Sequence, residues 1–515
     1  MKRERSFPPG IGWIPVLAAV ALALLVALFQ VSPQFATRVV GTAAALPGGA
    51  AAGVPGVSTS AAPGANQVGP NGQIGRSAPG GAGSAEKAPS GGGTAVACAA
   101  GKNGGATDKG VTANQIHVAS TIVTTGIGSG FLGEAADGMR AAIDQVNQAG
   151  GICGRRITSI DGSHAIETIN DGWDGPTGDR YIQSWCQGGS VFALVGEPDS
   201  QGLANAIENG DVDHCGIPVV GTDGMLSDQY YDPLVWPVAA STVTNMHIIA
   251  KYAVEQLHAK SFGIVYDTYY RFGAEGANAF DQEVRRLTGH GITGDDQKNS
   301  CAGSTAFCGI NAQAGVTSSE VTALNLGCGP CDVVVLLLEP KPAEDWMSAE
   351  SGNSGWYNHL LGGEPLFDDQ VGENCPGCGD AKLQVWTGYH AASQPFDSEK
   401  AVYTYCQALK AVNPSDDCHN EFTEGAYLGA MMFIKAAQTV GAEGLPLTRS
   451  NLKDVLDSQT FDLGLSQPLH YGSGLPHLAN TSMAAFSENY SGTFNGWNYD
   501  ATGFVADPAP GSDLH

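Results

Sequence analysis

The run from residue 116 to residue 156 constrains the fold of this chain more than any other part of the sequence. Residues 116–123 are apolar and rich in β-branched side chains, which predicts a buried strand. A loop of glycine, serine and threonine follows. Residues 134–148 then carry apolar side chains at intervals of three and four, the period of a helix. Gly150 and Gly151 end that helix, because glycine takes the left-handed C-terminal conformation without strain. Such a strand, loop and helix is the unit from which parallel α/β sheets are built.

The loop between this strand and helix would gather unpaired backbone N–H groups at a helix N-terminus, a geometry that holds a carboxylate or a phosphate. Gly128, Gly130 and Gly133 also spell GxGxxG, the dinucleotide-binding fingerprint. Its acidic partner would be Asp161, which follows the last glycine by about 28 residues, whereas the usual spacing is about 20. This spacing, and the signs of export at the N-terminus, disfavour a nucleotide.

The helix closes with the motif Asn147-Gln-Ala-Gly-Gly-Ile-Cys-Gly-Arg155. With this motif, the whole run resembles the start of type I periplasmic binding proteins, the solute receptors of branched-chain amino acid ABC transporters. The resemblance covers roughly residues 111–474. It implies two similar α/β lobes with parallel sheets, joined by three crossovers near residues 238–242, 383–390 and 464–469. It also implies hinge closure on a small ligand and an ABC permease as partner.

Strands and helices alternate along the rest of the chain, which also favours parallel sheets covered by helices on both faces. The clear strands are residues 191–196, 217–221, 261–266 and 332–339, and the clear helices are residues 175–187, 244–259, 273–287, 398–411, 421–440 and 448–456. We expect lobe 1 to comprise residues 98–240 and 388–466, and lobe 2 to comprise residues 241–387 and 467–515. Residues 476–515 show no informative pattern of their own.

The N-terminal residues indicate export. Lys2, Arg3 and Arg5 precede an apolar stretch at residues 11–31 that is long enough to span a bilayer. We expect residues 1–40 to be a membrane anchor; cleavage near Ala43–Ala45, which would give a secreted protein, is the alternative. Residues 41–97 are a linker of Gly, Ala, Pro and Ser that cannot bury enough apolar surface to fold. The globular part is therefore expected outside the cytoplasm.

Charge excludes nucleic acid as a partner. The chain has 51 acidic against 25 basic residues and a net charge of −26, which repels polyanions.

The twelve cysteines form an even set, which argues for disulfides in an exported chain. Proximity in sequence suggests Cys98–Cys153, Cys301–Cys308, Cys406–Cys418 and the two CxxC pairs, Cys328–Cys331 and Cys375–Cys378. Cys186 and Cys215 flank one strand–helix unit, a spacing at which the family also has a bridge. The two CxxC pairs could instead form a zinc site. The CGPC motif could be redox-active, but it precedes a strand and so lacks the helix N-terminus that lowers a thiol pKa.

Ligands of open α/β sheets bind beyond the carboxyl ends of the strands. Residues at these ends, supported by the resemblance, make up the predicted ligand site: Thr125, Phe131, Ser200, Thr222 and Gly224 in lobe 1, and Tyr270, Glu339 and Glu364 in lobe 2. The resemblance implies that Phe131 packs on the ligand and that Ser200 binds its carboxylate. An acid, Glu339 or Glu364, would bind its amine. The expected ligand is therefore an amino acid.

Several of these residues have a structural alternative. Ser200 could be a helix N-cap, Thr125 could cap its loop and Phe131 could be core. Asp199 and Asp223 could be solvated turn residues, or could fit a cationic or amide-bearing ligand.

No sequence motif of catalysis supports an enzyme. The chain lacks GxSxG, P-loop and HExxH motifs, so we expect no catalytic residues, no metal and no cofactor. The leading hypothesis is a membrane-tethered solute receptor of an ABC importer. The alternatives are a ligand-sensing ectodomain that signals through a separate partner and an extracytoplasmic thiol oxidoreductase.

Overall fold

The computed structural model describes residues 98–126, 128–292, 305–351, 356–375, 382–390, 396–491, 493–500 and 503–514. All of them belong to one compact unit, Ala88–His515. The predicted anchor and linker lie outside the described residues, as do Cys301 and Cys378. Within the described part of the chain, no helix combines the length and the apolar character needed to cross a membrane.

Lobe 1 is built on a parallel sheet whose strands follow the order β2-β1-β4-β5-β6, with β3 beside the second half of β1. These strands are β1 (Gln115–Ile122), β2 (Arg156–Thr158), β3 (Glu167–Asn170), β4 (Ala193–Val195), β5 (Val219–Thr222) and β6 (Val235–Pro237). The central strands are buried on both faces, which explains why their sequences are continuous apolar runs.

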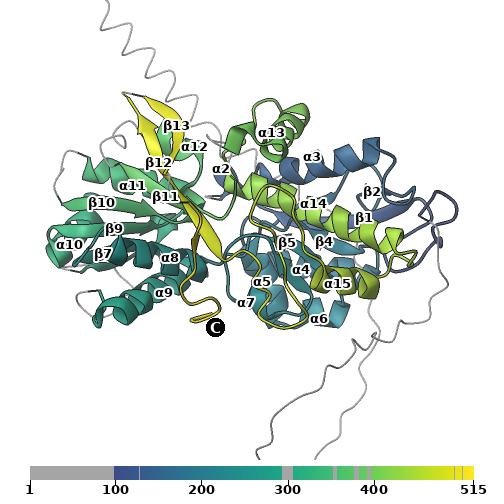
Figure 1. The fold of residues 1–515 in the computed structure, drawn as a ribbon, viewed down its shortest axis with the longest axis horizontal. Helices are drawn as coiled ribbons and strands as arrows, with labels where there is room; N and C mark the ends of the chain where they lie inside the picture. The colour runs from purple at the N-terminus through teal and green to yellow at the C-terminus, as the bar shows by residue number, and fades with distance from the viewer. Residues whose placement is uncertain are drawn as a thin grey trace, which may run out of the picture. The chain divides into compact units, whose positions relative to one another are not determined.

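Helices cover both faces of this sheet (Figure 1). One face carries α3 (Ala135–Gln148), α13 (Lys400–Val412) and α14 (Glu421–Ala442), and the other carries α4 (Gly175–Gly188), α5 (Ser200–Glu208) and α6 (Asp211–Cys215). Helix α14 lies directly against the backbone of β5, because two glycines meet there. A Cβ atom on Gly221 would stand 2.0 Å from Cα of Gly429. Gly221 also has φ +82°, a left-handed conformation that favours glycine.

Lobe 2 has a mixed sheet in the order β13-β12-β11-β10-β9-β7-β8, with β14 (Val505–Ala506) beside β12. Its parallel part contains β7 (Phe262–Asp267), β8 (Phe307–Ile310), β9 (Cys331–Leu337), β10 (Tyr357–Gly362) and β11 (Leu383–Thr387). The predicted parallel sheet is therefore present in this lobe, but it does not stop at these five strands. Strands β12 (Ser482–Tyr490) and β13 (Phe494–Tyr499) extend it with antiparallel pairing.

The helices of lobe 2 also cover both faces of its sheet (Figure 1). Helices α8 (Thr242–Glu255) and α9 (Arg271–Thr288) pack side by side on one face, and α10 (Ser318–Cys328) and α11 (Pro340–Glu350) lie on the other. The short α12 (Asp369–Glu373) follows β10. The strands and helices that the sequence pattern predicts are present, with their ends shifted by a few residues.

Three crossovers join the lobes, and hydrogen bonds join the crossovers to one another. The first leaves β6 at Val238, the second leaves β11 at Gly388, and the third runs from α15 (Arg449–Ser458) to β12. The second and third pair through the bridge Tyr389–Ser466. Asn480 Nδ2 donates to the carbonyl oxygens of Val238, at 3.2 Å, and Gly388, at 3.3 Å. The third crossover is longer than predicted, because it enters the lobe 2 sheet only at Ser482.

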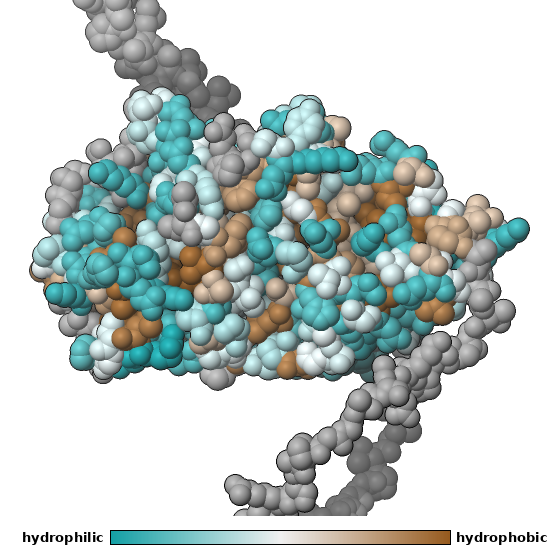
Figure 2. All heavy atoms as spheres, viewed as in Figure 1, coloured by the Kyte–Doolittle hydropathy of each residue, from teal (hydrophilic) through white to brown (hydrophobic). Residues whose placement is uncertain are grey.

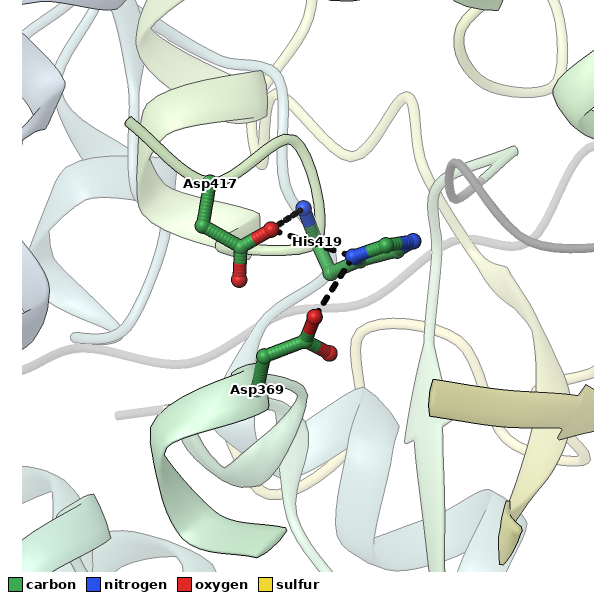
Figure 3. Close-up of side chains that lie close together, drawn as sticks. All are labelled: Asp369, Asp417 and His419. Carbon is green, nitrogen blue, oxygen red and sulfur yellow. Dashed lines mark hydrogen bonds and ion pairs between the residues drawn. The ribbon is translucent and has the colours of Figure 1, made fainter. Parts of the chain in front are cut away.

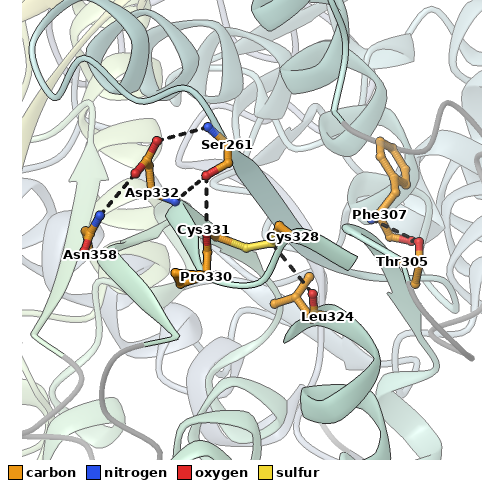
Figure 4. The surroundings of a disulfide bond; sticks show 9 residues. All are labelled: Ser261, Thr305, Phe307, Leu324, Cys328, Pro330, Cys331, Asp332 and Asn358. Atoms are coloured by element: carbon orange, nitrogen blue, oxygen red, sulfur yellow. Dashed lines mark hydrogen bonds between the residues drawn. A yellow bond between two sulfur atoms is a disulfide. The ribbon is translucent and has the colours of Figure 1, made fainter. Parts of the chain in front are cut away.

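Three predicted disulfides are confirmed: Cys98–Cys153, Cys186–Cys215 and Cys328–Cys331. Cys308 and Cys375 are also disulfide-bonded. The Cys328–Cys331 bridge joins the end of α10 to the start of β9 (Figure 4). It therefore lies at a helix C-terminus, where the dipole raises a thiol pKa. Because its two cysteines bond to each other, the alternative of a zinc site that includes them is wrong.

The predicted Cys406–Cys418 disulfide is wrong for this structure, in which both residues are free thiols. The two thiols are nevertheless neighbours, since the Cys406 thiol donates a hydrogen bond to Cys418, and this bond is the main cause that raises the pKa of Cys406. Sequence proximity predicted the contact correctly, but not the covalent bond.

Hydrophilic side chains cover much of the face seen in Figure 2, and apolar side chains appear there in separate patches. This distribution fits the large excess of acidic over basic residues in the chain.

Candidate functional site

A small cavity lies where the carboxyl ends of β4 and β5 meet the N-terminal part of α14 and the first two crossovers. It has room for about one water molecule. Its described lining residues are Gly196, Glu197, Pro198, Gly221, Asp223, Ala239, Tyr389, Glu421, Phe422, Gly425 and Ala426. Three of these eleven are acidic and none is basic.

The acidic lining side chains are desolvated, and neighbouring carboxylates add to the effect. Burial, with the charge of Asp199, raises the pKa of Glu197 to about 8. Burial raises the pKa of Asp223 to about 7. Burial, and then the charge of Glu364, raises the pKa of Glu421 well above its usual range. These carboxyl groups therefore resist ionisation as long as no positive charge is present.

Only some of the oxygen atoms of these acidic side chains accept hydrogen bonds. Glu197 accepts from the backbone N–H of Thr121 at 3.0 Å, from the Thr121 hydroxyl and from the Ser120 hydroxyl at 3.2 Å. Glu421 Oε2 and Asp223 Oδ2 have no hydrogen-bond partner among the described residues.

Lobe 2 adds a carboxyl group to the same region. Glu364 follows β10, and its Oε1 accepts from the backbone N–H of Gly388 in the second crossover, at 2.9 Å. Burial raises its pKa to about 8, and the charge of Asp223 acts in the same direction. The predicted residue Glu364 thus lies beside the cavity carboxylates of lobe 1.

A row of four aromatic rings runs from the cavity to the carboxyl end of β7. Phe422 lines the cavity and lies 5.2 Å from Phe131, which lies 5.7 Å from Trp173, between ring centroids. The ring of Trp173, in lobe 1, stacks on Tyr270 of lobe 2 at 3.7 Å. All four rings are buried. The predicted residues Phe131 and Tyr270 therefore belong to one apolar surface that crosses from one lobe to the other.

Glu339 and Asp267 stand at the far end of this row, after β9 and at the end of β7. Asp267 accepts hydrogen bonds from three backbone N–H groups, those of Tyr269, Tyr270 and Ala312. Glu339 is 1% exposed, and neither of its carboxylate oxygens has a hydrogen-bond partner among the described residues. Burial, and then the charge of Asp267, raises the pKa of Glu339 well above its usual range.

The helix N-terminus that should receive a ligand carboxylate is already occupied. Asp199 caps α5, because its side chain accepts from the backbone N–H groups of Gln201, at 3.2 Å, and Gly202, at 3.0 Å. The N-cap is thus Asp199 and not Ser200, and the alternative of Asp199 as a solvated turn residue is wrong, because this side chain is fully buried. The Ser200 hydroxyl lies 3.9 Å from the sulfur of Met225.

The other predicted residues of lobe 1 already serve local structure. The Thr222 hydroxyl donates to Gln229 Oε1, which also accepts from the backbone N–H of Gly224 at 3.2 Å. Gly224 has φ +66°, and a Cβ atom there would stand 2.2 Å from the Tyr230 hydroxyl. Thr125 is exposed and accepts from Asn170 Nδ2 at 3.0 Å, as the capping alternative expects.

Oppositely charged groups connect the lobes at the rim of this region. Arg271, at the start of α9, forms ion pairs with Glu208 at 2.5 Å and Asp228 at 2.7 Å, both in lobe 1. Beside it, Glu275 of lobe 2 accepts from the backbone N–H and the hydroxyl of Ser227 in lobe 1.

A second rim contact joins α12 of lobe 2 to the segment before α14 of lobe 1 (Figure 3). His419 Nδ1 lies 2.8 Å from Asp369 Oδ2 and 3.0 Å from Asp417 Oδ1. Burial alone would lower the pKa of His419, but the hydrogen bonds that His419 donates to both carboxylates outweigh this effect and raise the pKa to about 11. Nearby, Gln370 Nε2 donates to the carbonyl of Gly130 at 2.6 Å.

The ligand atoms of Asp369, Asp417 and His419 lie within 4.8 Å of one another, a spacing that could hold a metal ion. The nitrogen that would bind the metal is, however, the donor to both carboxylates. The charged imidazolium thus already supplies the cation that these two carboxylates require, and the cluster is an ion pair across the lobes.

Sequence reasoning missed Trp173, Glu421 and His419. Trp173 follows β3, a strand of four residues whose pattern is too short to predict. Glu421 starts a helix that was predicted, but only the docking of that helix brings it to the cavity. Glu197 and Asp267 follow predicted strands, so the strand-end rule selects them as candidates, but they are not among the residues predicted to bind the ligand.

A family model described as "Periplasmic binding protein" matches residues 115–487. No curated protein sequence matches the chain. Among solved structures, a fatty acid ABC transporter substrate-binding protein from Thermomonospora curvata is 16% identical with a TM-score of 0.63, over 80% of this chain and 96% of that one. An ABC transporter substrate-binding protein from Aeropyrum pernix is 18% identical with a TM-score of 0.59, over 78% and 98%.

A branched-chain amino acid transporter substrate-binding protein from Streptococcus pneumoniae, in complex with isoleucine, is 14% identical with a TM-score of 0.55, over 75% of this chain and 99% of that one. At these identities the solved structures show a shared fold.

Proposed function

The chain belongs to the type I periplasmic binding protein family, and from this premise we propose that it is the solute receptor of an ABC importer. It would capture a small polar molecule between its lobes by hinge closure and present it to a permease in the membrane. The proposal includes no catalytic step.

One observation carries the proposal: both lobes bring the carboxyl ends of their strands to the same buried region. Glu197 and Asp223 reach it from β4 and β5, and Glu364 reaches it from β10. Strand ends are where α/β sheets bind their ligands. Because only the crossovers connect the lobes covalently, this region can open and close around a solute without unfolding either lobe.

We also propose that the globular part works outside the cytoplasm, tethered by residues 1–40. The three described disulfides support this location, because such bonds persist in oxidising compartments. Protease treatment of intact cells should then digest the globular part while a cytosolic marker survives. Recovery of the intact fold from the cytosol would contradict this location.

The chemistry of the ligand has to come from the residues of the cleft. Two of the similar structures are a fatty acid ABC transporter substrate-binding protein and a branched-chain amino acid transporter substrate-binding protein in complex with isoleucine, so the fold alone does not identify the solute of this chain. We propose that the ligand of this chain is a small polar molecule, an amino acid or a related amine or amide.

The proposal is tested by measuring ligand binding and lobe closure on the full chain, purified in detergent. A thermal-shift panel of amino acids, amides, aliphatic amines and fatty acids finds the ligand, and amide hydrogen exchange then locates its effect. A bound ligand should protect the strand ends of both lobes, at residues 196–201 and 338–340. The proposal is wrong if no compound of the panel binds, or if protection is confined to one lobe.

A further inference from the structure

The buried region between the lobes contains acidic side chains but no basic partner for them. We call Glu197, Asp223, Glu364 and Glu421 the cavity carboxylates, and Asp267 with Glu339 the strand-end pair. Within the part of the chain that the structure describes, none of these six forms an ion pair with a lysine, arginine or histidine. The positive charges of the lobe interface, Arg271 and His419, lie at the rim and have acidic partners there.

Unpartnered atoms in this set point independently to a ligand. Glu421 is 6% exposed and lines the cavity, and its Oε2 has no hydrogen-bond partner among the described residues. Glu339 is more deeply buried, and neither of its oxygens has a hydrogen-bond partner within the described part of the chain. A buried polar atom without a partner is costly, and a buried charge more so. A ligand that brings its own positive charge and N–H donors would offset both costs.

The groups of lobe 1 that were predicted to bind a ligand carboxylate are already engaged within the protein. The N-terminal N–H groups of α5 already bind the Asp199 side chain, and the Thr222 hydroxyl already donates to Gln229. No basic side chain is among the described residues that line the cavity. The carboxylate of an amino acid would therefore meet the cavity carboxylates, and like charges at close range repel.

The aromatic row connects the two acidic groups. Phe422 lies at the cavity, and Tyr270 lies beside the strand-end pair. Aromatic faces attract ammonium groups and bury the methylene groups next to them. In the present structure Trp173 and Tyr270 touch at 3.7 Å, so a ligand chain that passed along the row would separate these two rings.

We propose that the cleft binds a linear aliphatic diamine or polyamine. One ammonium group would lie among the cavity carboxylates, the methylene chain would run along the aromatic row, and a second ammonium group would reach Asp267 and Glu339. The inference rests on the proposed function, because it assigns the ligand class of the same cleft.

Calorimetry on the full chain in detergent tests the ligand class with four named probes: putrescine, spermidine, butylamine and leucine. Putrescine and spermidine should bind, butylamine at least about tenfold more weakly because it lacks the second ammonium group, and leucine not at all. Tighter binding of leucine than of putrescine overturns the inference and leaves the proposed receptor function intact. If no probe binds and the wider panel also fails, the proposed function fails as well.

Two isosteric variants test the placement. Glu421→Gln and Glu339→Gln should each weaken putrescine binding by about ten- to hundredfold, the effect of losing a hydrogen bond to a charged group. The Glu339→Gln variant should also lose the distinction between putrescine and butylamine. Glu255→Gln, an exposed carboxylate on α8, is the matched control and should bind as the parent does. Denaturation midpoints of all variants report folding separately, and folded variants with parental putrescine affinity overturn the placement.

Discussion

The rim and the interior of the lobe interface treat charge in opposite ways. At the rim, two basic side chains face carboxylates of the other lobe: Arg271 pairs with Glu208, and His419 pairs with Asp369. In the interior, Glu197, Asp223 and Glu421 line one cavity without a basic partner among the described residues. Charges of opposite sign thus meet at the rim, where the lobes touch each other. Around the enclosed cavity, the described charged side chains are all acidic.

This difference separates two tasks. Ion pairs at a solvated rim are weak and reversible, so they bias closure without locking it. Buried carboxylates oppose closure by themselves, because dehydration and mutual repulsion disfavour their charged forms. Closure with a cation inside satisfies both regions together. The predicted consequences differ in size, and each one tests whether the two regions behave differently.

The largest expected effect is an inverted dependence of stability on pH. The pKa of Glu197 and that of Glu364 are raised to about 8 in the folded protein, so between pH 5 and pH 8 the folded state binds more protons than the unfolded state. Their contribution to stability is therefore full below the unfolded pKa of 4.5, and it is lost progressively as pH rises toward 8. We expect the free energy of unfolding of the ligand-free chain to drop by at least about 2 kcal/mol over this range.

Urea denaturation at pH 5, 6.5 and 8 measures this drop. The Glu197→Gln variant should show a shallower slope, because one of the titrating groups is gone. If the free energy of unfolding stays constant or increases from pH 5 to pH 8, burial does not raise the pKa values of the interior carboxyl groups.

A smaller effect is expected from His419→Ala, which removes the cation between Asp369 and Asp417. The two carboxylates would then face each other across the lobes without a partner, at a cost of about 1–3 kcal/mol. The variant should be less stable and exchange amide hydrogens faster at α12 and at residues 417–420. The exposed His359→Ala on β10 serves as control. If the two variants are equally stable, the contact of His419 with Asp369 and Asp417 does not hold the lobes together.

The smallest effect is expected from Arg271→Gln, because its ion pairs are exposed to solvent. We expect the free energy of unfolding to fall by at most about 1 kcal/mol, and we expect this loss to disappear in high salt. Arg286→Gln is a matched control on the same helix, since Arg286 pairs with Glu283 inside α9 and not across the lobes. If urea denaturation shows the same loss for both variants, the cross-lobe position of Arg271 has no special role.

The sequence predicted the parts of the fold that local patterns determine. Strand β1 and helix α3 carry clear periods, and the helix ends at two glycines as expected. Strands β12 and β13 escaped prediction because their burial is irregular and their pairing depends on the rest of the sheet. The short strands β2 and β3 have too few residues to show any period.

The candidate site was also predictable only where local sequence patterns determine it. The rule that ligands bind at strand ends selected Glu339, Glu364 and Phe131, and the structure places all three along the buried region between the lobes. The rule could not show that Asp199 would occupy the N-terminus of α5, because capping is settled by side-chain geometry. It also could not find Glu421, which reaches the cavity only because Gly221 and Gly429 let α14 approach the sheet.

The bonds from Asn480 to Val238 and Gly388 have a mechanical consequence. They connect the three crossovers to one another, so in the proposed hinge motion a twist about one crossover would move the other two. Opening would then have one principal degree of freedom, an angle about a single axis. Titration curves recorded at the rim and at the cavity should superimpose, and a population of molecules should divide into open and closed forms with few intermediates.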